Sequence, residues 1–203
     1  MSYLDQFISA LRFYFELNPT EPAPCDFDDL RQHFLHQQSS AQAPSMANTK
    51  KFLTLLAERF VEGYPGDIAH ACHAASAGFL HSWNASRLPG LPGTLSLTVG
   101  SVYFKGEPVF ETTRAVIAGL IDAGRAPAIN LPVHVWLTLD DLTVIDLSIV
   151  PTLVKYGRLP ADTPPVLFWR ENAAGAFVFD PLLVDNLFFE RIDSGSFTAP
   201  APC

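Results

Sequence analysis

Residues 132–139, PVHVWLTL, and residues 143–148, TVIDLS, are two apolar runs rich in β-branched side chains. The turn Asp140-Asp141-Leu142 separates them, so the stretch predicts a β-hairpin. In a hairpin whose turn centres near Asp140, residues whose numbers sum to about 280 face each other, which places His134 opposite Asp146. A slip of one residue would turn these two side chains to opposite faces of the sheet. The two turn aspartates are expected to be solvated.

The pairing of His134 with Asp146 indicates an oriented base. Side chains that face each other on neighbouring strands have Cβ atoms about 4.5 to 5.5 Å apart, so an imidazole can hydrogen bond to a carboxylate. The carboxylate then fixes the imidazole tautomer and stabilises its protonated form. Two structural interpretations stay open here. His134 could be a core histidine with a satisfied hydrogen bond, and Asp146 could close a turn or cap a helix that begins near Ser148.

A helix is predicted upstream of the hairpin, from Ile68 to about Arg87, because apolar residues recur there at helical spacing. Cys72 lies near its beginning, where unpaired backbone N–H groups and the helix dipole lower a thiol pKa. A backbone N–H in this place can also hold the oxyanion of a tetrahedral intermediate. The small side chains that follow Cys72 let the helix approach the hairpin closely. The competing interpretation is that Cys72 is a buried small hydrophobe.

The rest of the chain places helices first and strands later. Further helices are predicted at residues 3–17, from Asp26 through Leu35, from an N-cap at Asn48 to a stop at Gly63, and at residues 113–121. Residues 37–45 are interpreted as a linker or loop, and residues 182–192 fit either element. Strands are predicted at residues 94–99, 101–104, 166–170 and 176–179. This order predicts an α+β fold with N-terminal helices packed on a C-terminal antiparallel β-sheet.

A cysteine that opens a helix, followed by strands carrying His134-Val135-Trp136 and Val144-Ile145-Asp146, resembles the transglutaminase-like and papain-like cysteine hydrolases, as a distant branch. The arrangement is also similar to arylamine N-acetyltransferases, and the resemblance covers residues 64–151. It implies a papain-like or transglutaminase-like fold and a catalytic triad with Cys72 as nucleophile, His134 as base and Asp146 as orienting acid. The implied activity is that of a cysteine peptidase, amidase or acyltransferase on a peptide, amide or thioester, with no cofactor.

The sequence departs from these families at the oxyanion hole. Papain-like enzymes carry a glutamine upstream of the nucleophile, yet no glutamine lies between residue 43 and the cysteine. Tyr64 or His70 would have to replace it. His73 and Trp136 are further candidates near the substrate, although Trp136 is expected mainly to pack beside the imidazole. The motifs Gly-x-Cys-Trp and Arg-Gly-Gly-x-Cys are also missing, so the substrate class does not carry over. A catalytically inactive binding or scaffold protein of the same fold is the alternative function.

The composition is that of one folded domain with an excess of acidic residues. The chain has 203 residues, 48% of them hydrophobic and 17% charged, and a formal net charge of -8. Residues 1–203 are expected to form a single domain, with a helical part at 1–62, a cysteine-hydrolase-like core at 64–193 and a tail at 194–203. The acidic balance disfavours a nucleic-acid partner. The sequence shows neither a signal peptide nor an apolar run long enough to span a membrane. These features predict a cytoplasmic protein with no membrane partner.

The other cysteines and the histidines beside Cys72 are expected to play no part in a metal centre. Cys25 lies in a proline-rich stretch and Cys203 is the last residue, and their wide spacing indicates neither a disulfide framework nor a zinc ribbon. A metal site made by His70, Cys72 and His73 is a third interpretation. Consecutive residues on a helix diverge by about 100°, so Cys72 and His73 do not easily share one ion.

Overall fold

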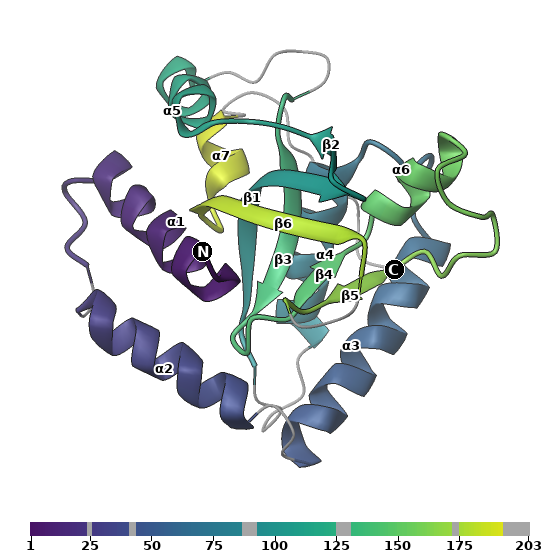
Figure 1. The fold of residues 1–203 in the computed structure, drawn as a ribbon, viewed down its shortest axis with the longest axis horizontal. Coiled ribbons are helices and arrows are strands. Elements are labelled where there is room, and N and C mark those ends of the chain that lie inside the picture. The colour runs from purple at the N-terminus through teal and green to yellow at the C-terminus, as the bar shows by residue number, and fades with distance from the viewer. Residues whose placement is uncertain (24–25, 41–43, 87–92, 125–130, 172–174, 193–203) are drawn as a thin grey trace.

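The computed structural model describes residues 1–23, 26–40, 44–86, 93–124, 131–171 and 175–192. In these ranges the chain has an α+β architecture, in which N-terminal helices pack against a curled antiparallel sheet (Figure 1). The predicted fold class is therefore confirmed at the level of α+β. Cys25, Cys203 and the predicted tail lie outside the described residues.

Three helices make up the N-terminal part: α1 (Tyr3–Leu17), α2 (Phe27–Ser40) and α3 (Pro44–Glu62). The loop predicted at residues 37–45 is wrong for 37–40 and 44–45, which are helical, and residues 41–43 are not described. The predicted N-cap at Asn48 is wrong as well. The helix already begins at Pro44, whose fixed φ suits the first turn of a helix. No helix in the described part of the chain is both long and apolar enough to cross a membrane.

The sheet is built around one long strand, β1 (Leu95–Phe104), where two strands were predicted. One edge of β1 pairs with β3 (His134–Leu139) and then with β2 (Glu107–Phe110), and its other edge pairs with β6 (Phe177–Val184). The sheet continues from β3 to β4 (Val144–Asp146) and β5 (Leu167–Trp169), and all these pairs are antiparallel. The later helices are α4 (Cys72–Ser86), α5 (Arg114–Ala123), α6 (Ile149–Lys155) and α7 (Phe188–Ile192).

Helix α1 lies along β6 on one face of the sheet (Figure 1). Its Tyr3 is buried, and the Tyr3 hydroxyl accepts a hydrogen bond from Trp136 Nε1 at 3.0 Å. The same hydroxyl lies 2.9 Å from the Thr138 hydroxyl, which lies 2.8 Å from that of Thr98. Trp136 and Thr138 would each lose a partner if α1 shifted, so these contacts fix α1 relative to β3, and Thr138 continues them to β1.

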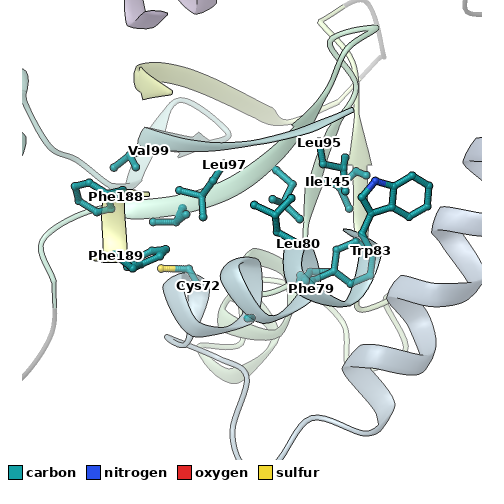
Figure 2. Packing of buried hydrophobic residues seen from close by; sticks show 14 of the residues in the cluster. Cys72, Phe79, Leu80, Trp83, Leu95, Leu97, Val99, Ile145, Phe188 and Phe189 are labelled. Carbon is teal, nitrogen blue, oxygen red and sulfur yellow. The ribbon is translucent and has the colours of Figure 1, made fainter. Parts of the chain in front are cut away.

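Helix α4 packs on the other side of the sheet. Ala75 and Ser76 are almost fully buried, and Ser76 Oγ donates a hydrogen bond to the Val135 carbonyl at 3.1 Å. The small side chains after Cys72 therefore do bring the helix close to β3. Figure 2 shows the apolar face of α4 against β1, with α7 beside the start of α4; the labelled side chains include Cys72, Phe79, Leu80, Trp83, Leu95, Leu97, Phe188 and Phe189.

The hairpin of β3 and β4 forms as predicted, but with a different register. Leu137 pairs with Ile145, and these numbers sum to 282. The turn centres on Asp141 because Leu139 and Thr143 close it and Leu142 adopts a φ of 63°. The prediction that His134 directly faces Asp146 is therefore wrong by two positions. Since a shift of two residues preserves the face of each side chain, the pair still lies on one face, as diagonal neighbours.

The expectation of a solvated turn is wrong for Asp141, which is buried. Its Oδ2 lies 2.5 Å from Lys50 Nζ and also contacts the guanidinium of Arg170, while its Oδ1 accepts a hydrogen bond from the Thr143 N–H. Two cations from distant parts of the chain thus compensate one buried carboxylate. These contacts attach α3 and the segment after β5 to the turn of the hairpin.

Candidate active site

Cys72 is the first residue of α4. The predicted start at Ile68 is wrong, because the residues before Cys72 form a turn. Asp67 Oδ1 accepts a hydrogen bond from the Ala69 N–H at 2.9 Å, and His70 adopts a left-handed φ of 69° that no helix continues through. Cys72 therefore lies in the first helical turn, where backbone N–H groups have no acceptor inside the helix.

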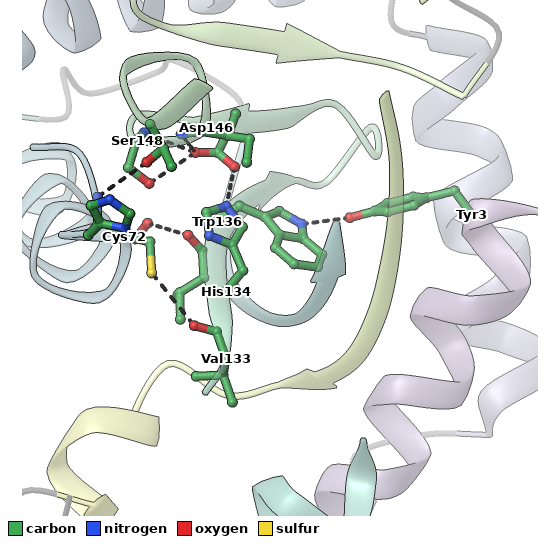
Figure 3. Close-up of polar contacts among 12 residues, drawn as sticks. Tyr3, Cys72, Val133, His134, Trp136, Asp146 and Ser148 are labelled. Carbon is green, nitrogen blue, oxygen red and sulfur yellow. Dashed lines mark hydrogen bonds and ion pairs between the residues drawn. The ribbon is translucent and has the colours of Figure 1, made fainter. Parts of the chain in front are cut away.

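His134 opens β3 and Asp146 closes β4, and their side chains contact each other (Figure 3). The distance between His134 Nε2 and Asp146 Oδ2 is 2.6 Å, and both side chains are fully buried. The predicted contact is therefore present in spite of the changed register. A buried imidazole and a carboxylate at this distance form a charge-assisted hydrogen bond.

Asp146 is held in place by its second oxygen. Its Oδ1 accepts hydrogen bonds from the backbone N–H groups of Ser148 at 3.0 Å and Ile149 at 2.9 Å. These N–H groups stand at the start of α6, so Asp146 caps that helix and orients His134 at the same time. The carboxyl group cannot rotate without losing both backbone donors. The direction of the His134 ring is thus set by the backbone of α6.

The contact with Asp146 determines which nitrogen of His134 can act as a base. A carboxylate oxygen only accepts, so Nε2 carries the hydrogen and Nδ1 has the lone pair in the neutral ring. Nδ1 is buried and has no hydrogen bond to any described residue. Phe110 stacks on the ring with centroids 4.5 Å apart, and Trp136 lies 6.0 Å away. The ring is therefore fixed, with Nδ1 as the nitrogen left for proton exchange.

Cys72 and His134 meet where β3 begins. The Cys72 thiol donates a long hydrogen bond, 3.8 Å, to the carbonyl of Val133, the residue before His134 (Figure 3). Val135 lies in the hydrophobic cluster of Cys72, whereas Trp136 belongs to the cluster of α1. Cys72 is the first residue of α4, and His134 is the first residue of β3. The sulfur therefore approaches the imidazole around the end of the sheet and not through it.

The ionisation of Cys72 and His134 is coupled. Burial raises the pKa of the Cys72 thiol, but the positive charge of His134, with a smaller contribution from His73, lowers it to about 6. Burial lowers the pKa of His134, but Asp146 and the Cys72 thiolate raise it to about 10. Between these values both side chains are charged, as a thiolate and an imidazolium. A thiolate at neutral pH is the form of cysteine that acts as a nucleophile.

A pocket of about 480 Å³ opens beside Cys72. This volume falls in the range of small-molecule sites. Cys72 and Val133 are buried in its wall, and exposed polar side chains stand among the residues that line it. The lining residues are His70, Cys72, His73, Val109, Phe110, Leu131, Val133, Thr152, Leu153, Tyr156 and Arg158.

His70 and His73 both line this pocket, as candidates near a substrate should. The ring of His70 is exposed, and its Nε2 lies 2.9 Å from the Tyr156 hydroxyl. Its backbone N–H donates to Thr152 Oγ1 at 3.2 Å, so α6 holds the turn before Cys72. His73 also packs against the ring of Phe189, with centroids 5.8 Å apart.

Tyr64 and Trp136 occupy different environments. Burial and then the charge of Cys72 raise the pKa of the Tyr64 phenol, which does not line the pocket. Trp136 is fully buried, and its indole N–H donates to Tyr3. Trp136 does not line the pocket, and its expected packing beside the imidazole is present.

The metal interpretation has no support in the described part of the chain. There, no three side chains of His, Cys, Asp or Glu gather so as to bind an ion. His70, Cys72 and His73 have other contacts: His70 with Tyr156, His73 with Phe189, and Cys72 with Val133.

Several residues of the pocket were not predicted. Phe110 comes from the short strand β2, and Thr152, Tyr156 and Arg158 come from α6 and the residues after it. Gly157, with a φ of 67°, was a usable signal for a helix end. It would have placed Tyr156 and Arg158 at the end of a helix, but no local pattern places them beside Cys72.

Comparisons with protein-family models, with curated proteins and with solved structures find no match for this chain.

Proposed function

We propose that this protein is a cysteine hydrolase or acyltransferase of the transglutaminase-like or papain-like type, acting on an amide or thioester. The observation that carries the proposal is the buried Nδ1 of His134. The hydrogen bond from Nε2 to Asp146 leaves Nδ1 as the basic nitrogen, and the Cys72 thiol, which donates to the carbonyl of the preceding residue Val133, supports the proposal from the other side. Nucleophile, base and orienting acid in this relation are the parts of an acyl-transfer site.

The reaction proceeds in two steps. The thiol proton passes to His134 Nδ1, and the Cys72 sulfur attacks the substrate carbonyl carbon to form a tetrahedral oxyanion. When the oxyanion collapses, the bond to the leaving amine or thiol breaks, and that group takes the proton from Nδ1. The acyl group is then a thioester on Cys72. Water or an amine attacks it, gives its proton to Nδ1, and releases the product and the thiol.

The oxyanion has two candidate donors in place of the missing glutamine. One is the backbone N–H of Cys72, which lies in the first turn of α4 and has no acceptor within that helix. The other is the phenol of Tyr64, whose pKa responds to the charge of Cys72 and which makes no hydrogen bond with another described residue. His70 suits this role less because its ring nitrogen is engaged with Tyr156.

The proposal is tested by trapping the acylated cysteine. The protein, with Cys25 and Cys203 replaced by serine, is incubated with p-nitrophenyl acetate, and the modified peptide is identified by mass spectrometry. We expect one acetyl group on Cys72, none on the Cys72→Ala variant, and acylation slower by about a hundredfold or more in His134→Ala, since positioned bases contribute at least that factor. Circular dichroism checks that both variants fold. Equal acylation of wild type and His134→Ala would contradict the proposal.

A catalytically inactive binding or scaffold protein is the second candidate. The observation that favours it is the burial of Cys72, which is 5% exposed and lies close to Phe189 in the same cluster. Under this alternative the pocket binds a ligand that is never acylated by the thiol. A folded wild-type protein whose Cys72 resists both p-nitrophenyl acetate and small alkylating reagents would support the alternative.

A further inference from the structure

We propose that the pocket binds an acyl group that carries a carboxylate, and that Arg158 binds this carboxylate. The inference rests on the proposed function, because it names the class of acyl donor for the same site. The acyl donor is a small amide or thioester whose acyl chain ends in an acid group. Three features of the pocket support this: its lining, the position of Arg158, and the balance of charge around it.

The pocket has apolar walls and a polar rim. Val109, Phe110 and Leu131 supply partly buried apolar surface, which suits the short chain of an acyl group. The exposed residues of the lining are His70, Tyr156 and Arg158. A substrate that reaches the Cys72 sulfur with its carbonyl can therefore lay its acyl chain against the apolar surface and meet these exposed polar groups with the part that lies toward the rim.

Arg158 has no carboxylate partner among the described residues. Its backbone N–H is fixed by a 2.8 Å hydrogen bond to the Leu153 carbonyl at the end of α6. Its guanidinium lies over the ring of Phe104, with Cζ 5.5 Å from the centroid, and makes only a 3.5 Å contact with the Phe104 carbonyl. The described ion pairs of arginine and lysine side chains engage Arg31, Lys50, Lys155, Arg170 and Arg191. The fork of N–H donors on Arg158 is thus available to a ligand.

The charge of the pocket is opposite to that of the chain. The protein has 21 acidic and 13 basic residues, yet no Asp or Glu stands among the described residues that line the pocket. The basic side chains of the described lining are His70, His73 and Arg158, and the amino end of α4 also points its dipole here. An acidic protein that keeps carboxylates out of one pocket and places an arginine there favours an anionic ligand over a neutral or cationic one.

Two alkylating probes of nearly the same size test the proposal. Iodoacetate carries a carboxylate and iodoacetamide does not, and both react with the same sulfur. The alkylation rate of Cys72 is measured with each probe near pH 7, in protein whose other cysteines are serine. We expect Arg158→Gln to lower the ratio of the iodoacetate rate to the iodoacetamide rate about fivefold, the upper range for a partly exposed charge pair. The ratio is the readout because a change in the reactivity of the thiolate itself alters both rates alike.

Two matched variants show whether the effect belongs to Arg158. Lys105→Gln removes a cation that lies over the same Phe104 ring, 5.1 Å from its centroid, but does not line the pocket. Lys105→Gln should leave the ratio of the two rates unchanged. Arg158→Lys keeps the positive charge and should keep most of the wild-type ratio. Higher salt should lower the wild-type ratio toward that of Arg158→Gln. An unchanged ratio in Arg158→Gln, or an equal fall in Lys105→Gln, would overturn the proposal.

The two proposals fail in different ways. If Cys72 is an ordinary thiol, the iodoacetamide rate alone shows this through its absolute value and pH dependence, whatever the ratio of the two probes. If Cys72 is reactive but the ratio does not depend on Arg158, the cysteine chemistry stands and the anionic acyl group is wrong.

Discussion

Asp146→Ala should lower both the free energy of unfolding and the reactivity of Cys72 by large factors. The substitution leaves the fully buried His134 without its partner and the start of α6 without its cap. Removing one member of a buried charged pair costs about 3 to 5 kcal/mol, and the lost cap adds about 1 kcal/mol. Urea denaturation measures the stability, and the rate of Cys72 alkylation by iodoacetamide at pH 7 measures the reactivity.

Asp146→Asn separates these two effects. An asparagine has one side-chain oxygen, whereas Asp146 uses one for α6 and another for His134. If the oxygen stays with the two backbone N–H groups, the amide NH2 faces His134 and forces the hydrogen onto Nδ1. We expect a smaller loss of stability than in Asp146→Ala, and acylation slower by about a thousandfold or more, as for other bases held in the wrong tautomer. A variant that keeps wild-type reactivity would show that Asp146 only caps α6.

Gly100→Ala should destabilise the fold strongly, although it adds only one carbon. Gly100 pairs with His134 in the sheet, and β6 crosses it at a bulge. A Cβ at this position would overlap the Asp180 carbonyl oxygen and lie 2.8 Å from the Trp136 ring. Backbone and a buried indole cannot both give way, so we expect a loss of about 3 kcal/mol, the upper range for overpacking in a core. Urea denaturation provides the measurement.

Gly119→Ala is the matched control for this variant. Gly119 lies inside α5, and a Cβ there would meet nothing within 4 Å. Alanine should therefore stabilise the protein by about 0.5 to 1 kcal/mol through its higher helix propensity. If the two variants were equally stable, the close approach of β6 to Gly100 would be wrong, and with it the position of the His134 end of β3.

The sequence was sufficient to predict that His134 and Asp146 lie side by side, because the error in the predicted register was an even number of residues. The turn was predicted at Asp140 and lies at Asp141, since Leu142 takes a left-handed φ that its residue type does not indicate. An odd error would have put the two side chains on opposite faces. The position of Cys72 in a helix was also predicted, although the left-handed φ of His70 makes it the first residue of that helix.

The remaining parts of the site depend on contacts between distant segments. Arg158, Tyr156 and Phe110 reach the pocket only through the path of the chain around the sheet, which no local periodicity encodes. The burial of Asp141 has the same origin, because Lys50 and Arg170 come from segments on either side of it in the sequence. Local sequence patterns indicate helices, strands and the buried face of each. Contacts between segments that are far apart in the sequence become visible only in the tertiary structure.

The most direct test of the account is the pH dependence of Cys72 alkylation by iodoacetamide, in wild type and in His134→Ala. A thiolate forms above the thiol pKa, and His134 lowers that pKa to about 6. The wild-type rate should therefore reach half its plateau near pH 6. Without His134, burial raises the pKa, so the rate in His134→Ala should rise only above the ordinary thiol value of about 8.5. A wild-type profile that rises near pH 8.5 and does not change in His134→Ala would contradict the thiolate–imidazolium pair.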